Sequence, residues 1–118
     1  MAERVRGVIY VWSPHMPLSV DGVDTVRRAA SPRGLAVTVV LDPGASLTLA
    51  VGIAAARGWP QSTLYVADSV ELTFRDLLVH APAVQVYANG RLVGSPFPGH
   101  HTVDEYSAYF DRVISGPP

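Results

Sequence analysis

Two apolar runs with a helical segment between them constrain the fold of this chain more than any other feature. Val5–Trp12 and Leu35–Leu41 consist mostly of β-branched and aromatic side chains, which is typical of strands buried on both faces of a sheet. The segment between them carries apolar residues at helical spacing and predicts a helix that begins near Asp21, as its N-cap, and ends before Pro32. This β-α-β order predicts an α/β fold.

The middle of the chain predicts two more helices and a short strand. Residues 45–57 begin with strand-like alternation, but their length and alanine-rich end favour a helix that Gly58 ends. We therefore predict a helix and keep a strand as the alternative. Thr63–Ala67 is predicted to be a short strand, and Asp68-x-x-Glu71 has the pattern of a capping box at the start of another helix.

The last third of the chain predicts a hairpin followed by a helix. Asn89-Gly90 lies between the strand-like segments Ala83–Ala88 and Arg91–Gly94, and this dipeptide is typical of tight hairpin turns. After a turn at 96–99, Thr102-x-x-Glu105 is a second capping box, and the residues that follow have helical spacing. The whole order predicts one domain with a mixed sheet of about five strands, covered by helices on both faces.

Composition fits a single globular domain and excludes several classes of function. Of 118 residues, 16% are charged and the net charge is −1, so the chain is too apolar to be disordered. The only adjacent basic pair is Arg27-Arg28, so we expect no nucleic-acid partner. All nine basic residues are arginine, which indicates the coding bias of a GC-rich, bacterial genome. The chain has no cysteine, which excludes disulfides, thiolate chemistry and cysteine zinc sites.

No segment predicts membrane insertion or export. The apolar run Val8–Trp12 is shorter than the apolar region of a signal peptide. Leu47–Ala56 is too short and too rich in small residues to span a bilayer. We therefore expect no membrane insertion and no export signal in this chain. The compartment stays open, the periplasm included, and so does the oligomeric state.

Three segments resemble the thioredoxin superfamily, in that family's order. The strand ending in Trp12 leads into Ser13-Pro14-His15-Met16, where family members carry Cys-x-x-Cys, and the enclosed Pro14-His15 is similar to that of the periplasmic disulfide oxidases. His80-Ala81-Pro82, directly before a strand, resembles the cis-proline that faces the redox motif. The third segment is the hairpin with its closing helix. The resemblance covers most of the chain, with 45–67 as an insertion.

The resemblance implies a thioredoxin-like fold without its redox chemistry. Dithiol exchange requires one thiolate that attacks and a second thiol that resolves. Ser13 and Met16 occupy the two cysteine positions, and neither an alcohol nor a thioether can form a disulfide. We expect a cis peptide bond between Ala81 and Pro82, close to the segment Trp12–Met16, and no thiol-oxidation activity.

The preferred functional interpretation is a binding or assembly domain for a peptide or protein partner. Redox members of the family bind substrates beside the cis-proline, and ligands of open α/β sheets lie beyond the strand ends. Trp12 and Met16 are then predicted to supply apolar contact, and Ser13 and His15 hydrogen bonds. Ala81 is predicted to offer its backbone to an extended segment. The site residues are completed by Pro14 and Pro82. The alternative is that Trp12 and Pro82 are structural remnants.

Metal binding and hydrolysis remain as two further alternatives. His15, Met16, His80, His100 and His101 combine imidazole with thioether, which suits copper. Adjacent histidines project in different directions, however, and no carboxylate is placed to orient them. Ser13 with a histidine base lacks an orienting acid and the Gly-x-Ser-x-Gly elbow. We therefore predict no metal, no cofactor and no catalytic residue.

Overall fold

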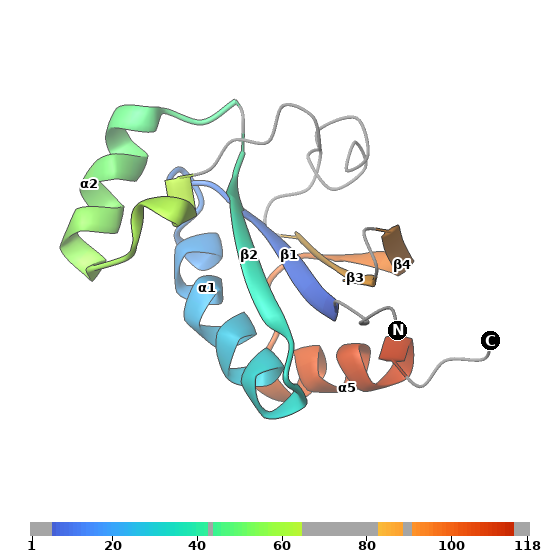
Figure 1. Cartoon of the computed structure of the whole chain (residues 1–118). Coiled ribbons are helices and arrows are strands. Elements are labelled where there is room, and N and C mark those ends of the chain that lie inside the picture. The colour runs from blue at the N-terminus through green and yellow to red at the C-terminus, as the bar shows by residue number, and fades with distance from the viewer. Residues whose placement is uncertain (1–5, 43, 65–82, 89–90, 115–118) are drawn as a thin grey trace, which may run out of the picture.

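The computed structural model describes residues 6–42, 44–64, 83–88 and 91–114 (Figure 1). Four strands in this part form one mixed sheet in the order β2-β1-β3-β4. β1 runs parallel to β2 and antiparallel to β3, and β3 runs antiparallel to β4. The structure therefore confirms the α/β class and the mixed sheet. The strand bounds are β1 (Arg6–Trp12), β2 (Ala36–Leu41), β3 (Ala83–Ala88) and β4 (Arg91–Pro98).

The two strands predicted from apolar runs differ in how deeply they are buried. β1 lies between β2 and β3, and its residues Val8–Trp12 are buried whichever face of the sheet they occupy. β2 lies at one end of the described sheet: Ala36 and Thr38 are exposed, whereas Val39–Leu41 are buried. The prediction of a fully buried strand is therefore right for β1 and right only for the second half of β2.

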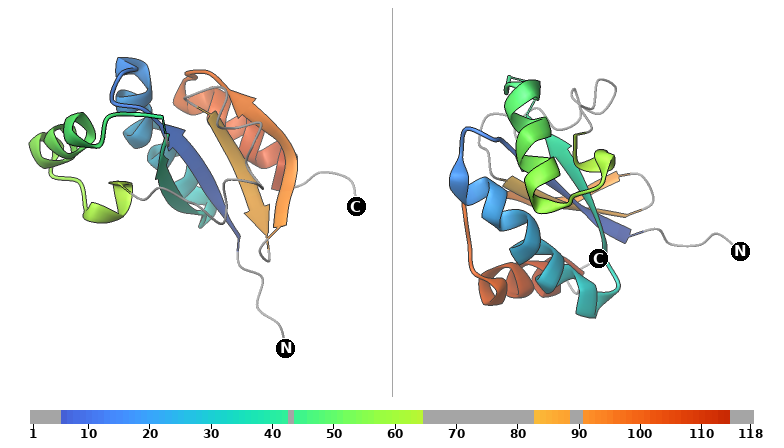
Figure 2. Two further views of the ribbon diagram at one scale, coloured as in Figure 1. Left: turned by 90° about the horizontal axis from the view of Figure 1, so that it is seen from above. Right: turned by 90° about the vertical axis from the view of Figure 1, so that its left-hand side faces the viewer.

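Two helices pack side by side on one face of the sheet (Figure 2). α1 (Pro17–Ala30) buries Val20, Val23 and Val26, as its helical spacing predicts, and α5 (Val103–Ile114) buries its aromatic side chains in the same core. The predicted start of α1 at Asp21 is wrong, because the helix already begins at Pro17. Proline suits the first helical position, since its fixed φ is helical and its missing N–H would have no partner there.

The capping box predicted for α5 is confirmed by both of its hydrogen bonds. The backbone N–H of Thr102 donates to Glu105 Oε1 at 2.9 Å, and the N–H of Glu105 donates to Thr102 Oγ1 at 3.1 Å. The bond from Thr102 also holds the pKa of the Glu105 carboxyl below its ordinary value. The start of this helix could thus be predicted from sequence.

For residues 45–57 the structure confirms the predicted helix and not the alternative strand. α2 (Leu47–Arg57) is capped by Ser46, whose hydroxyl accepts a hydrogen bond from the N–H of Leu49 at 3.2 Å. The helix ends at Gly58, which has a left-handed φ of 68°. α2 projects beyond the β2 edge of the sheet (Figure 2) and buries only Ala50 and Ala54.

The strand predicted at Thr63–Ala67 is wrong for its first two residues, which belong to a 3-10 turn, Gln61–Leu64. Thr63 is fully buried, and both its N–H and its hydroxyl donate to the carbonyl of Pro60, at 3.1 and 2.7 Å. These local bonds hold the chain in a turn. Residues 65–67 and the helix predicted from Asp68 lie outside the described residues.

β4 is longer than the sequence predicts. The expected end at Gly94 and the turn at 96–99 are wrong, because the strand continues to Pro98. Among the described strands β4 is the last of the sheet, so the missing N–H groups of Pro96 and Pro98 can face away from the ladder. Gly94, with φ of 73°, lies where β4 passes the irregular pairing between Val84 and Val86. The Asn89-Gly90 turn lies outside the described residues.

An exposed ion pair joins the end of the first helix to the last one. The guanidinium of Arg33 donates to both oxygens of Asp111, at 2.7 and 2.9 Å. These hydrogen bonds hold the pKa of the Asp111 carboxyl below its ordinary value. A depressed carboxyl pKa stabilises the fold above the unfolded-state value of about 3.9, and this stabilisation is lost as the pH falls through the folded-state pKa.

We therefore expect Asp111→Asn to be less stable than the wild type at neutral pH and equally stable in strong acid. The measurement is the urea midpoint of both proteins at a series of pH values, with Asp24→Asn on the exposed side of α1 as the control. A gap between Asp111→Asn and the wild type that stays constant from neutral to acid pH would contradict the role of this pair.

Candidate functional site

A single buried serine organises the turn that follows β1. Ser19, on α1, is fully buried, and its hydroxyl accepts a hydrogen bond from the N–H of Ser13 at 2.9 Å. The same hydroxyl lies 2.7 Å from the carbonyl oxygens of both Ser13 and Met16, which share its proton. Sequence reasoning missed Ser19, although a serine on the buried side of an amphipathic helix is itself a signal of such a role.

Tyr10, on β1, belongs to the same buried hydrogen-bond network as Ser19. Its hydroxyl donates to the carbonyl of Ser19 at 2.6 Å. Burial raises the pKa of the Tyr10 phenol far above its ordinary value, and the charges of Tyr106 and Asp21 add to the effect. The phenol therefore stays protonated and keeps donating, which fixes the first turn of α1 against β1.

We expect Ser19→Ala to lower the free energy of unfolding by about 1–3 kcal/mol, because it leaves the buried N–H of Ser13 without its acceptor. Chemical denaturation followed by circular dichroism measures this loss. Ser31→Ala, at an exposed position after α1, should change stability by less than about 0.5 kcal/mol. Equal stability of the two variants would show that the turn does not depend on Ser19.

Trp12 and Ser13, which are predicted to contact a partner, have buried side chains. Trp12 is fully buried, donates from its indole N–H to the carbonyl of Thr63 at 2.8 Å, and packs edge-on against Trp59 with the ring centroids 5.2 Å apart. Ser13 is 4% exposed, and its hydroxyl accepts the N–H of His15 at 3.2 Å. Both residues are occupied in holding the turn, so neither presents a free side chain to solvent.

His15 links the turn to α2. Its Nε2 accepts a hydrogen bond from the N–H of Ser46, the cap residue of α2, at 3.1 Å. The imidazole therefore faces α2 rather than the Ser13 hydroxyl, and the two are not arranged as base and nucleophile. Beside it, Met16 and Leu18 are 46% and 58% exposed. Among the predicted contact residues that the structure describes, His15 and Met16 are thus the ones that reach the surface.

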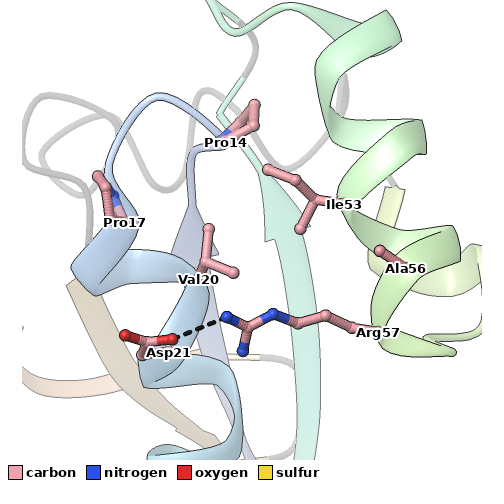
Figure 3. Close-up of a pocket in the computed structure, with 7 residues that line it drawn as sticks. All are labelled: Pro14, Pro17, Val20, Asp21, Ile53, Ala56 and Arg57. Carbon is pink, nitrogen blue, oxygen red and sulfur yellow. Dashed lines mark hydrogen bonds and ion pairs between the residues drawn. The ribbon is translucent and has the colours of Figure 1, made fainter.

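A groove of about 330 Å³ lies between α1 and α2, next to this turn (Figure 3). Most of its lining is apolar, and the groove was not evident from sequence because its two sides are more than 30 residues apart. One end is crossed by an ion pair, in which Arg57 Nη2 lies 2.9 Å from Asp21 Oδ1. The lining residues are Pro14, Pro17, Val20, Asp21, Ile53, Ala56 and Arg57.

The candidate metal ligands have different neighbours. His15 contacts Ser46, whereas His101 stacks on Phe97 with the ring centroids 3.8 Å apart and lies 2.8 Å from the carbonyl of Pro98 through its Nε2. In the described part of the chain, no three His, Asp or Glu residues gather in a way that could hold a metal ion. Met16 and His100 add exposed side chains at the turn and at the loop before α5.

The predicted site has a second segment, which comes directly before β3 in the sequence. His80, Ala81 and Pro82 lie outside the described residues. The cis peptide bond and its proximity to Trp12–Met16 therefore stay predictions. What the structure does bring together is the turn after β1, the start of α1 and the inner side of α2.

The comparisons with protein-family models and with curated proteins give no relative from which a function could be transferred. Neither a protein-family model nor a curated protein matches the chain. Within the described ranges, none of the helices has the length and apolar character needed to cross a bilayer. The class that the structure defines is a cysteine-free α/β domain with a mixed sheet.

Proposed function

We propose that this chain is a non-redox, thioredoxin-like binding domain that recognises a peptide or protein partner at its degenerate active-site end. The observation that carries this proposal is the apolar groove between α1 and α2, which borders the turn at the Cys-x-x-Cys position. In this proposal, an apolar side chain of the partner enters the groove, while the exposed His15 and Met16 contact the residues that flank it.

The size and lining of the groove support a small apolar occupant. A volume of about 330 Å³ is at the lower end of the range for ligand sites, so it suits one or two side chains rather than a large cofactor. Val20 and Ile53 supply apolar contact. The ion pair between Asp21 and Arg57 carries no net charge, and an uncharged occupant therefore meets no unpaired charge in the groove.

The residues at the turn divide into two roles in this proposal. Trp12 and Ser13 position the turn from inside, while Met16 offers a flexible thioether chain that adapts to different apolar partners. Because His15 Nε2 accepts from Ser46, the neutral imidazole carries its proton on Nδ1 and can donate it to a partner carbonyl. We propose in addition that Ala81 and Pro82 provide the backbone edge, opposite this turn, against which an extended segment of the partner binds.

Selection from a random peptide library displayed on phage tests the proposal without knowledge of the natural partner. We expect the bound peptides to share a large aliphatic or aromatic residue. Ile53→Asp should weaken their binding at least about tenfold, since it places a charge against an apolar occupant. Ala55→Asp, on the exposed side of the same helix, is the matched control and should bind as the wild type does.

Two results would overturn the proposed function. One is a library that yields no peptide above background with a folded domain. The other is binding that Ile53→Asp and Ala55→Asp change equally, because the site would then not be the groove. Circular dichroism of each variant verifies that the domain is folded.

A further inference from the structure

Polar contacts attach both ends of α2 to the neighbouring elements. At the start of the helix, the N–H of its cap residue Ser46 donates to His15 Nε2 at 3.1 Å, across to the turn after β1. At its end, Arg57 pairs with Asp21 of α1 at 2.9 Å (Figure 3). Between these ends only two alanines of α2 are buried. Because so little of the helix packs into the core, the two polar contacts help to hold this wall of the groove in place.

The contact at the start of α2 exists only while the imidazole of His15 is neutral. A ring nitrogen that accepts a hydrogen bond carries no proton, whereas both nitrogens of an imidazolium are donors. A protonated Nε2 would therefore face the N–H of Ser46, donor against donor. Its positive charge would also lie at the N-terminal end of α2, where the helix dipole disfavours cations. Because His15 is exposed, the protonated ring can turn away into water.

We propose that protonation of His15 detaches the start of α2 from the turn after β1 and loosens this wall of the groove, so that the domain binds its partner more weakly in mild acid. An imidazole ordinarily takes up a proton near pH 6.5, which is about the middle of the physiological range. The contact is therefore present above this range and is lost as the pH falls through it. The effect on binding rests on the proposed function, whereas the detachment of α2 does not.

Few ionisable side chains lie near this contact on the described elements. α2 carries none before Arg57, the segment that leads into it carries Asp42, and the start of α1 carries Asp21. Carboxylates and guanidinium groups ordinarily keep their charge between about pH 5.5 and about pH 7.5, whereas histidines change theirs. His100 lies beside α1, so a test must separate its protonation from that of His15.

Amide hydrogen exchange, measured by NMR on the isotope-labelled domain, tests the contact without any partner. The protection of the Ser46 amide, corrected for the pH dependence of intrinsic exchange, should fall about three- to tenfold from neutral pH to mild acid, which is the equilibrium factor of one hydrogen bond. His15→Gln keeps a side-chain acceptor at both pH values, and of the four histidines of the chain the other three remain. Its Ser46 protection should therefore stay constant, whereas His15→Ala should show low protection at both pH values.

Two results of this measurement would overturn the proposal. One is a wild type whose Ser46 protection is the same at both pH values. The other is a fall in Ser46 protection that persists in His15→Ala, because another group would then cause it.

Affinity for a selected peptide tests the consequence for the groove. A peptide without His, Asp or Glu should bind the wild type about three- to tenfold more weakly in mild acid than at neutral pH. Its affinity for His15→Gln should be the same at both pH values, and an equal fall for both proteins would overturn the coupling to His15. A library that yields no peptide contradicts the proposed function alone, since exchange at Ser46 still decides whether protonation of His15 detaches α2.

Discussion

Trp12→Ala should lower the free energy of unfolding by about 3–5 kcal/mol, which is the range for truncating a large buried aromatic side chain. Trp12 is fully buried, it packs against Trp59, and its indole bonds the carbonyl of Thr63. The substitution removes all three contributions and leaves a cavity at the end of β1. Because small domains have a total stability of about 5–15 kcal/mol, a loss of this size should lower the denaturation midpoint well below that of the wild type.

Urea denaturation, followed by far-ultraviolet circular dichroism, measures this loss. Trp12→Phe keeps one aromatic ring in the core but loses the hydrogen bond to Thr63, so we expect the free energy of unfolding to fall by about 1–3 kcal/mol. Leu47→Ala, at a residue that is 57% exposed, should cost less than about 0.5 kcal/mol. A Trp12→Ala domain as stable as Leu47→Ala would mean that the indole is not the support of the turn.

Gly22→Ala should destabilise the domain by about 2–4 kcal/mol, although the same change in an open helix stabilises it. Gly22 is buried on α1, and a Cβ placed there would clash with the hydroxyl oxygen of Tyr10 and lie 3.1 Å from its Cζ. The Tyr10 ring would have to move, which costs about 1–3 kcal/mol of overpacking. The ring would also give up its bond to the carbonyl of Ser19, at a further cost of about 1 kcal/mol.

A double-mutant cycle separates this clash from a general effect of alanine. Tyr10→Phe removes the hydroxyl that the new methyl group would meet, so the double variant Tyr10→Phe, Gly22→Ala should be more stable than the sum of the two single changes predicts. Gly52→Ala, at an open position of α2, should stabilise the domain by up to about 1 kcal/mol. Strict additivity of the two changes at Tyr10 and Gly22 would rule out the proposed contact.

Features with a local sequence signal could be predicted from the sequence. The capping box at Thr102 and Glu105 needs only residues three apart, and both of its bonds form. The buried spacing of Val20, Val23 and Val26 likewise depends on helical periodicity alone. Even so, the same periodicity did not show that α1 starts at Pro17, because proline both interrupts a helix and begins one.

Features that depend on distant residues could not be predicted. The sequence predicts Trp12 to contact a partner, whereas in the fold its indole contacts Trp59 and Thr63. These two residues follow α2 in the chain and are far from Trp12 in sequence, so no local pattern indicates that they meet it. The groove could not be predicted for the same reason, because Asp21 and Arg57 meet only when α2 lies beside α1. His15 and Met16 are predicted to contact a partner, and both residues are exposed.

β4, at one end of the described sheet, is poorly suited to accept a foreign strand. No described strand pairs with the outer side of β4, and the two prolines of β4 interrupt the row of N–H donors that an incoming strand requires. β2, at the other end of the described sheet, packs against the 3-10 turn Gln61–Leu64. Unpaired edges are the usual starting points of intermolecular β-association. The two prolines of β4 therefore hinder association of copies of this domain through that strand.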